Sequence, residues 1–177
     1  MSRDERFEKG NMKNISKIRE NSLAQILLEE SLITQEHLDS AEEERNATGD
    51  LLIDILLKNE YVTEMELAKS LVKNYQLPFL HPQDYQINKD AKDLLPAAFL
   101  HTHKLYPIDI FGKTLAVITS GNIDEAIIKE IESTTGKEVA LFVAPHHGLL
   151  RALAEFFPLD EITSELNDRM DELFGVP

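Results

Sequence analysis

One phrase of the sequence occurs twice. Residues 23–38 read LAQILLEESLITQEHL, and residues 52–67 read LIDILLKNEYVTEMEL. In both copies, an apolar run at helical spacing is followed by an apolar pair, a threonine and an acidic first turn. Each copy therefore predicts a helix, a tight turn and a second helix. The repetition predicts two versions of one helix-turn-helix unit.

Residues that start and stop helices divide the two copies into four short helices. Thr34 is expected to cap the second helix, and Thr63 with Glu66 forms a Thr-x-x-Glu capping box for the fourth. Gly49 is expected to end the second helix in the left-handed conformation, and Asp50 to cap the third. The fourth helix is expected to turn its apolar side inward, and the residues of that side are Leu67, Leu71 and Val72.

Beyond Pro78 the pattern changes from helices alone to a mixture of strands and helices. The expected strands are Phe79-Leu80, Leu105 to Phe111, Thr114 to Thr119 and Glu138 to Ala144, the middle two forming a hairpin turned at Gly112-Lys113. The expected helices are Ala91 to Leu100, Asp124 to Thr134 and His147 to Phe156, with Gly136 as the stop of the second. The predicted fold class is thus α+β, a four-helix repeat followed by a small α/β sandwich-like subdomain.

These patterns divide the chain into four parts. Residues 1–20 are a polar leader expected to be disordered, and residues 21–76 are the helical repeats, whose first helix Asn21 or Ser22 can cap. Residues 77–157 are the α/β subdomain. Residues 158–177 form an acidic amphipathic segment, expected either to dock on its own domain or to bind a groove of a partner. Its candidate partner-binding residues are Leu159, Ile162, Leu166, Met170 and Leu173.

Composition excludes several classes of function. The chain has 177 residues, a formal net charge of −14 and no cysteine. The charge disfavours binding to nucleic acid or to anionic lipid, and the absence of cysteine excludes disulfides and thiolate sites. With neither a signal-peptide core nor a membrane-spanning run, the sequence predicts a cytoplasmic protein.

No pattern predicts an enzyme or a metal centre. His101 and His103 would share one face of a strand, but no carboxylate is placed beside them, so a metal site is not expected. The pair His146-His147 follows a proline and is expected to cap a helix or to face solvent. Gly112-Lys113-Thr114 lacks the earlier glycine of a phosphate-binding loop, and Ser120 lacks the glycines of a nucleophile elbow.

The order of the pieces resembles a known family. The motifs that carry the resemblance are the two repeats, then Tyr75-Gln76-Leu77-Pro78-Phe79-Leu80, Asp93-Leu94-Leu95-Pro96, His103-Lys104-Leu105-Tyr106-Pro107-Ile108 and Gly112-Lys113-Thr114-Leu115-Ala116-Val117. Together they are similar to the MshEN-type domain, the N-terminal domain of the assembly ATPases of type II secretion (the GspE N-terminal domain family) and type IV pili. The resemblance covers roughly residues 20 to 157 and implies a regulatory or docking module. The ATPase motor is not in the sequence, so a stand-alone module is expected.

Some members of this family bind cyclic di-GMP through the two repeats, and the resemblance assigns the corresponding positions here. Each family unit has an Arg-Leu-Gly opening, a second glycine before an apolar pair and a glutamine near the end of the second helix. In that order, the first unit has Ser22, Leu23, Ala24, Ser31 and Arg45, and the second has Leu51, Leu52, Ile53, Glu60 and Asn74. The leucines remain, whereas both arginines and all four glycines are replaced.

The replacements predict a loss of nucleotide binding. Removing two charged donors costs about 3–6 kcal/mol, and Glu60 adds a carboxylate where a dianionic ligand would lie. The expected function is a non-catalytic protein-interaction module with a degenerate cyclic di-GMP motif, no cofactor and a protein partner in secretion or pilus machinery. The alternative is a cyclic dinucleotide sensor with altered contacts in the two repeats, in which Arg45 and Asn74 supply polar groups.

Overall fold

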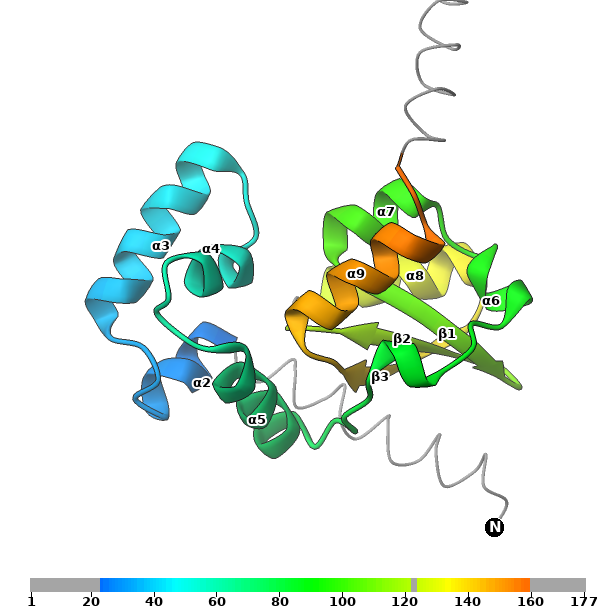
Figure 1. Cartoon of the computed structure of the whole chain (residues 1–177), viewed down its shortest axis with the longest axis horizontal. Helices are drawn as coiled ribbons and strands as arrows, with labels where there is room; N and C mark the ends of the chain where they lie inside the picture. Colours follow the sequence, from blue (N-terminus) through cyan, green and yellow to red (C-terminus); the bar gives the residue numbers. More distant parts are fainter. Residues whose placement is uncertain (1–22, 122–123, 160–177) are drawn as a thin grey trace, which may run out of the picture.

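The computed structural model describes residues 23–121 and 124–159. The leader 1–20 and most of the acidic segment 158–177 lie outside the described residues. Within the described residues four helices come first, followed by a three-stranded sheet with helices around it (Figure 1). This arrangement confirms the predicted α+β class. The helices of the repeats are α2 (Leu23–Glu29), α3 (Gln35–Thr48), α4 (Leu52–Lys58) and α5 (Glu64–Tyr75).

Both repeats use the same local chemistry to connect their helices. The threonines confirm their predicted capping role, since Thr34 accepts from the backbone N–H of His37 and Thr63 from that of Glu66. In each case the third residue of the helix reciprocates, which completes a capping box. Gly49 ends α3 with a left-handed φ of 78°, also as predicted.

The helices of the two repeats pack crosswise. The first helix of the second repeat, α4, lies against α3, and the first helix of the first repeat, α2, lies against α5. A carboxylate holds each of these contacts. Glu44 on α3 accepts from Lys58 and Asn59 at 2.8 Å each. Each of these contacts joins a helix of one repeat to a helix of the other. The two repeats therefore form one helical subdomain.

Glu30, at the end of α2, makes the denser of these two contacts. Its carboxylate accepts from Ser70 and Lys73 at 2.6 Å each and from Asn74 at 3.1 Å. These hydrogen bonds, the one from Lys73 first, lower the pKa of Glu30 to about 2. The carboxylate is therefore ionised at neutral pH.

The sheet has the strand order β1-β2-β3. Strands β1 (Leu105–Phe111) and β2 (Thr114–Thr119) form the predicted antiparallel hairpin, turned at Gly112-Lys113. Helix α8 (Glu125–Thr135) then carries the chain to β3 (Glu138–Val143), which pairs with β2 in parallel. Asp124 caps α8 and Gly136 ends it in the left-handed conformation. Phe79 makes a single parallel bridge to Val143, so the expected first strand is reduced to one pairing.

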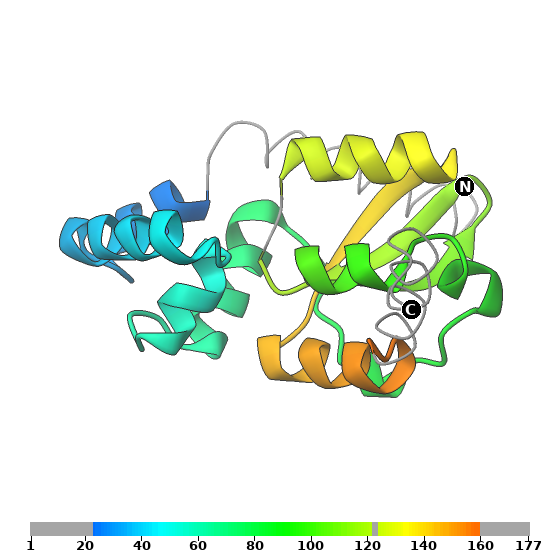
Figure 2. The same ribbon diagram turned by 90° about the horizontal axis from the view of Figure 1, so that it is seen from above.

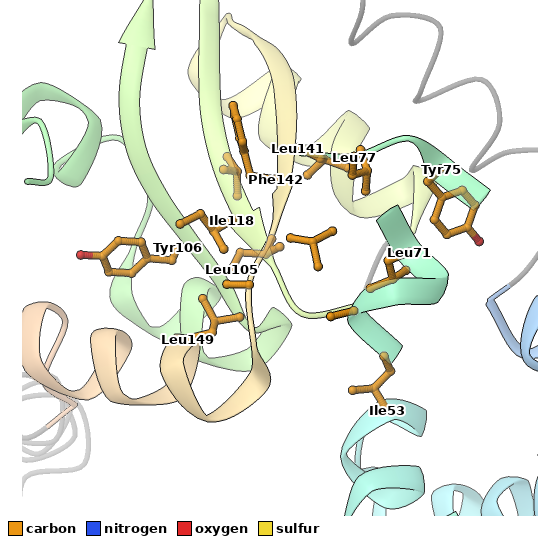
Figure 3. Packing of buried hydrophobic residues seen from close by; sticks show 14 of the residues in the cluster. Ile53, Leu71, Tyr75, Leu77, Leu105, Tyr106, Ile118, Leu141, Phe142 and Leu149 are labelled. Atoms are coloured by element: carbon orange, nitrogen blue, oxygen red, sulfur yellow. The ribbon is translucent and has the colours of Figure 1, made fainter. Parts of the chain in front are cut away.

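Helices cover both faces of this sheet. Seen from above, α8 lies on one side, and α7 (Ala97–His103) and α9 (His146–Phe156) lie on the other (Figure 2). Short helices η1 (Pro82–Asp84) and α6 (Lys89–Lys92) complete the connection from α5 to the sheet. The buried side chains form one hydrophobic cluster that continues from Leu71 of α5 to Leu141 and Leu149 around the sheet (Figure 3).

Three local predictions were wrong. A single helix was expected from Ala91 to Leu100, but the chain forms α6 and α7 on either side of Pro96, which removes an N–H donor and disfavours helix at the preceding residue. Leu51 occupies the cap position of α4 without a side-chain hydrogen bond, in place of Asp50. Val72 is 37% exposed, whereas its neighbours Leu67 and Leu71 are buried as expected.

The helical subdomain meets the sheet subdomain at Gly121, the second residue after the end of β2. This residue has a φ of 134°, and a Cβ added to it would lie 2.1 Å from Cδ1 of Ile53 on α4. Leu23 of α2 approaches the same point, at 3.5 Å. The first helices of both repeats thus converge on one glycine, because only a residue without a side chain leaves room for them.

Glu30→Gln is expected to destabilise the domain by about 1–3 kcal/mol at neutral pH, because three donors lose a charged acceptor. The folded pKa of Glu30 lies below its ordinary value, so its stabilisation is present above pH 4.5 and is lost as the pH falls toward about 2. Urea denaturation at several pH values measures this effect. The variant should show a shallower loss of stability over that acid range, and a slope equal to that of the wild type would contradict the assignment.

Gly121→Ala is expected to cost about 1–3 kcal/mol, because the new methyl group meets Ile53 and the backbone is left in a conformation that favours glycine. Ile53→Val removes the Cδ1 atom that Cβ would contact. In this background the cost of Gly121→Ala should be smaller, and a double-mutant cycle by thermal or urea denaturation measures the coupling. Strictly additive effects would show that the two residues do not meet.

Candidate functional site

The described residues that the resemblance assigns to the nucleotide motif lie at or near the ends of the repeat helices. Ser22 lies outside the described residues. Ser31 and Glu60 occupy the turns between helices, Arg45 lies in the last turn of α3, and Leu51 precedes α4. The remaining positions lie within helices: Leu23 and Ala24 in α2, Leu52 and Ile53 in α4, and Asn74 in α5.

Ser31 and Glu60 both adopt the left-handed conformation, with φ of 56° and 57°. In each turn two backbone bonds close the helix end: Leu32 and Tyr61 donate to the carbonyls of Leu27 and Leu56 at 2.9 Å, while Ser31 and Glu60 donate to Leu28 and Leu57. This is the Schellman arrangement, in which glycine is favoured at the left-handed residue. Side chains at these two positions cost about 1–2 kcal/mol each.

Several of the other positions already serve the packing of the domain. Asn74 donates its amide to Glu30 and to the backbone carbonyl of Ser70, at 3.1 and 2.9 Å. Ile53 is buried against Gly121. Arg45, by contrast, is exposed on the surface. Asn74 and Ile53 are therefore engaged within the fold, whereas Arg45 is an exposed cation at the end of α3.

A pocket of about 760 Å³ lies between the helical subdomain and the sheet subdomain. Its lining residues on the helical side come from α4, the turn at Glu60 and the start of α5. On the other side it is lined by Lys104, which follows α7, and by the first turns of α9. Charges of both signs face this pocket, so it has no clear preference for an anion or a cation.

Three side chains join the subdomains beside this pocket, and two of them, Asp54 and His146, line it. Oγ of Ser120, after β2, lies 2.8 Å from Nδ1 of His146, and Nε2 of His146 lies 3.3 Å from Oδ1 of Asp54 on α4. Burial raises the pKa of Asp54 and lowers the pKa of His146, and in each case desolvation exceeds the attraction between the two groups. Both residues are thus held toward their neutral forms.

The prediction for His146 was wrong in this respect. It is 8% exposed and bonded within the core, whereas capping or solvent exposure was expected for the pair His146-His147. His147 is exposed, and its ring contacts the carboxylate of Glu64 at the start of α5. Glu64 also accepts from the backbone N–H of His147, at 3.3 Å. Sequence reasoning missed both contacts because their partners lie far apart in the chain and no local pattern marks them.

Ser120, His146 and Asp54 have the composition of a nucleophilic triad, but their geometry does not suit that chemistry. Ser120 is 2% exposed, so a substrate carbonyl cannot reach its oxygen, and the chain around it is packed against Ile53. The three groups are better explained as a polar contact that aligns two subdomains. His101 and His103 lie on helix α7 and not on a strand, so they do not share a face as expected. Within the described residues, no three histidines or carboxylates gather at a point that could hold a metal ion.

A second hollow, of about 410 Å³, runs along the outer side of α5, and we refer to it as the α5 groove. Three of its lining side chains are large, apolar and exposed: Met65 at 60%, Val72 at 37% and Phe79 at 39%. The other lining residues are Ala68, Lys69, Lys73, His81 and Pro145. The groove is thus apolar along its floor and basic at its edge.

Of the predicted partner-binding residues, only Leu159 is described, and it is 44% exposed at the end of the described chain. Ile162, Leu166, Met170 and Leu173 lie outside the described residues. In the parts that are described, no helix is both long and apolar enough to cross a bilayer.

Comparison with known proteins agrees with this architecture. The model of the MshEN domain matches residues 75–163, about half of the chain. The type IV pilus assembly ATPase PilB of Myxococcus xanthus is 23% identical over 154 residues, which cover 84% of this chain and 27% of that protein. The PilB protein of Thermus thermophilus is 26% identical over 143 residues, which cover 80% of this chain and 16% of that protein. The chain therefore spans only a minor part of the length of these relatives.

Two solved structures share the fold. The N-terminal domain of XpsE superposes with a TM-score of 0.61 at 20% identity, covering 76% of this chain and 92% of that one. A structure of MshE with cdg gives a TM-score of 0.57 at 22% identity, covering 77% of this chain and 99% of that one. With its two capped repeats, its mixed sheet and the matched family model, this chain belongs to the MshEN domain family.

Proposed function

We propose that this chain is a non-catalytic regulatory module that binds a protein of secretion or pilus machinery in the cytoplasm through the α5 groove. The observation that carries the proposal is the gathering of exposed Met65, Val72 and Phe79 along one groove. Among the described residues, the large exposed apolar side chains are these three, Tyr85 and Leu159. Apolar surface concentrated in this way is typical of an interaction site.

The conformation of α5 explains why these side chains are exposed. The buried side of the helix uses Leu67 and Leu71 for the core, so Met65 and Val72 project from its opposite side. Phe79 comes from the chain that leaves α5, after Pro78 has ended the helical region. Core packing does not require apolar residues at these three places. A partner that buries them would gain roughly 1.5–3 kcal/mol for each fully covered side chain.

The state of the nucleotide positions supports a protein ligand. Asn74 is bonded to Glu30, and Ile53 fills the space beside Gly121. Glu60 lines the pocket between the subdomains with a carboxylate. A dianionic nucleotide in the family's position would meet this charge and would lack the two arginines that the family units supply.

Photo-crosslinking in the native cell tests the proposal. With p-benzoylphenylalanine at position 65, we expect an adduct to a component of secretion or pilus machinery, because Met65 lies in the α5 groove. The same group at position 85 is the matched control, since Tyr85 is 47% exposed but does not line the groove. Val72→Asp should abolish the adduct at position 65. Equal adducts at both positions, or none at position 65, would contradict the proposal.

The second candidate function, a cyclic dinucleotide sensor, is favoured by one observation. The left-handed turns at Ser31 and Glu60 keep a backbone conformation that favours glycine, and Arg45 is exposed in the last turn of α3. MshE, which shares the fold, was solved with cdg.

Calorimetric titration with cyclic di-GMP separates the two functions. We expect no binding in the micromolar range, because the replaced donors correspond to a loss of at least about a hundredfold in affinity. A micromolar dissociation constant that Arg45→Ala abolishes would favour the sensor. Lys129→Ala serves as the control, since Lys129 is an exposed cation on α8 that pairs with Glu125 and has no place in the repeats.

A further inference from the structure

The α5 groove and the acidic end of the chain have complementary chemistry. We propose that residues 160–177 of the same chain occupy the α5 groove, with Leu166, Met170 and Leu173 as the anchors. This inference rests on the proposed function of the groove as a protein-binding surface. It adds the identity of one occupant, and with it a form of self-inhibition, because a partner must displace the segment before it can bind.

The α5 groove and the acidic segment carry opposite charges. Two lysines, Lys69 and Lys73, stand at the edge of the groove, and none of the described residues that line it is acidic. Lys73 is already paired with Glu30 at 2.6 Å, which leaves the ammonium group of Lys69 to attract an acidic segment. Residues 160–177 contain one basic residue, Arg169, and six acidic ones: Asp160, Glu161, Glu165, Asp168, Asp171 and Glu172. The segment therefore carries the charge that the groove attracts.

The apolar residues of the acidic segment have helical spacing. Leu166, Met170 and Leu173 recur at the i, i+4 and i+7 positions of an amphipathic helix, and three of the six acidic residues fall between them. A helix of this kind presents its apolar side to a groove and its charged residues to the edges. The floor of Met65, Val72 and Phe79 offers the matching apolar surface.

The acidic segment is long enough to reach the α5 groove. Pro145, which lines the groove, directly precedes α9, and this helix of 11 residues leads away for about 16 Å. The end of α9 is fixed, because the carbonyl of Phe157 lies 2.6 Å from Nε2 of His101 and Lys92 lies over the ring of Phe157. Residues 160–165 span about 20 Å when extended, which is enough to return along α9. Leu166, Met170 and Leu173 can then lie beside the groove.

Paramagnetic NMR on the full chain tests this proposal. The sequence has no cysteine, so Ser164→Cys accepts a single nitroxide label within the acidic segment. Methionine methyl groups labelled with ¹³C report on the groove through Met65. We expect the nitroxide to broaden the Met65 resonance. Leu166→Asp should weaken docking by about tenfold or more and reverse the broadening, since it places a carboxylate at an apolar anchor.

Matched variants separate docking from unfolding. Lys69→Glu should also reduce the broadening, because it reverses a charge at the edge of the groove. Tyr85→Ser should leave it unchanged, since Tyr85 is a large exposed side chain that lies outside the groove. Thermal denaturation of each variant should give the midpoint of the parent, and a variant that melts early is replaced by Leu173→Asp.

Mixing experiments decide whether the occupant is the same chain. Nitroxide-labelled chain without ¹³C is mixed with ¹³C-labelled chain without the cysteine. Broadening of Met65 in this mixture would show docking between two copies and would overturn the proposal. Broadening absent in every sample would also overturn it, while leaving the crosslinking result for Met65 to decide the proposed function. Broadening present without any crosslinked partner would instead count against the proposed function alone.

Discussion

The arrangement of the two subdomains depends on the close approach of α4 to Gly121. Ile53 and Leu23, from the first helices of the two repeats, converge on this residue, and a single added methyl group would occupy the same space. Around it, Asp54 and Glu64 reach from the helical side to His146 and His147 at the start of α9. Apolar contact at the centre and polar contacts beside it hold the repeats in one orientation relative to the sheet.

The sequence predicted local elements well because their determinants are local. Thr34, Thr63 and Gly49 specify helix ends through their own side chains or lack of one, and all three behave as expected. The hairpin at Gly112-Lys113 follows from the same kind of signal. Where the prediction failed, a competing constraint prevailed: Pro96 divided the expected helix into two, and Val72 turned outward although its residue type suggested the core.

The candidate site was only partly accessible from the sequence. The assignment of nucleotide positions from the family resemblance stays a prediction. Ser31 and Glu60, both assigned to family glycines, adopt left-handed φ values of 56° and 57°. The engagement of Asn74 with Glu30 could not be foreseen, because it arises from the crosswise packing of helices from different repeats. Neither the contact between His146 and Asp54 nor the α5 groove has a sequence signature, since both require knowledge of which elements meet.

The short sheet also carries its own protection against aggregation. Strand β1 lies at one edge of the sheet. Pro107 in this strand lacks an N–H donor, and the backbone N–H of Asn88 donates a hydrogen bond to the carbonyl of Ile108. At the other edge, both backbone groups of Val143 are bonded to the chain at Pro78 and Leu80. Blocked edges of this kind prevent strands of neighbouring molecules from adding to the sheet. Contacts of this domain with other molecules at these positions must therefore be made by side chains and not by strand addition.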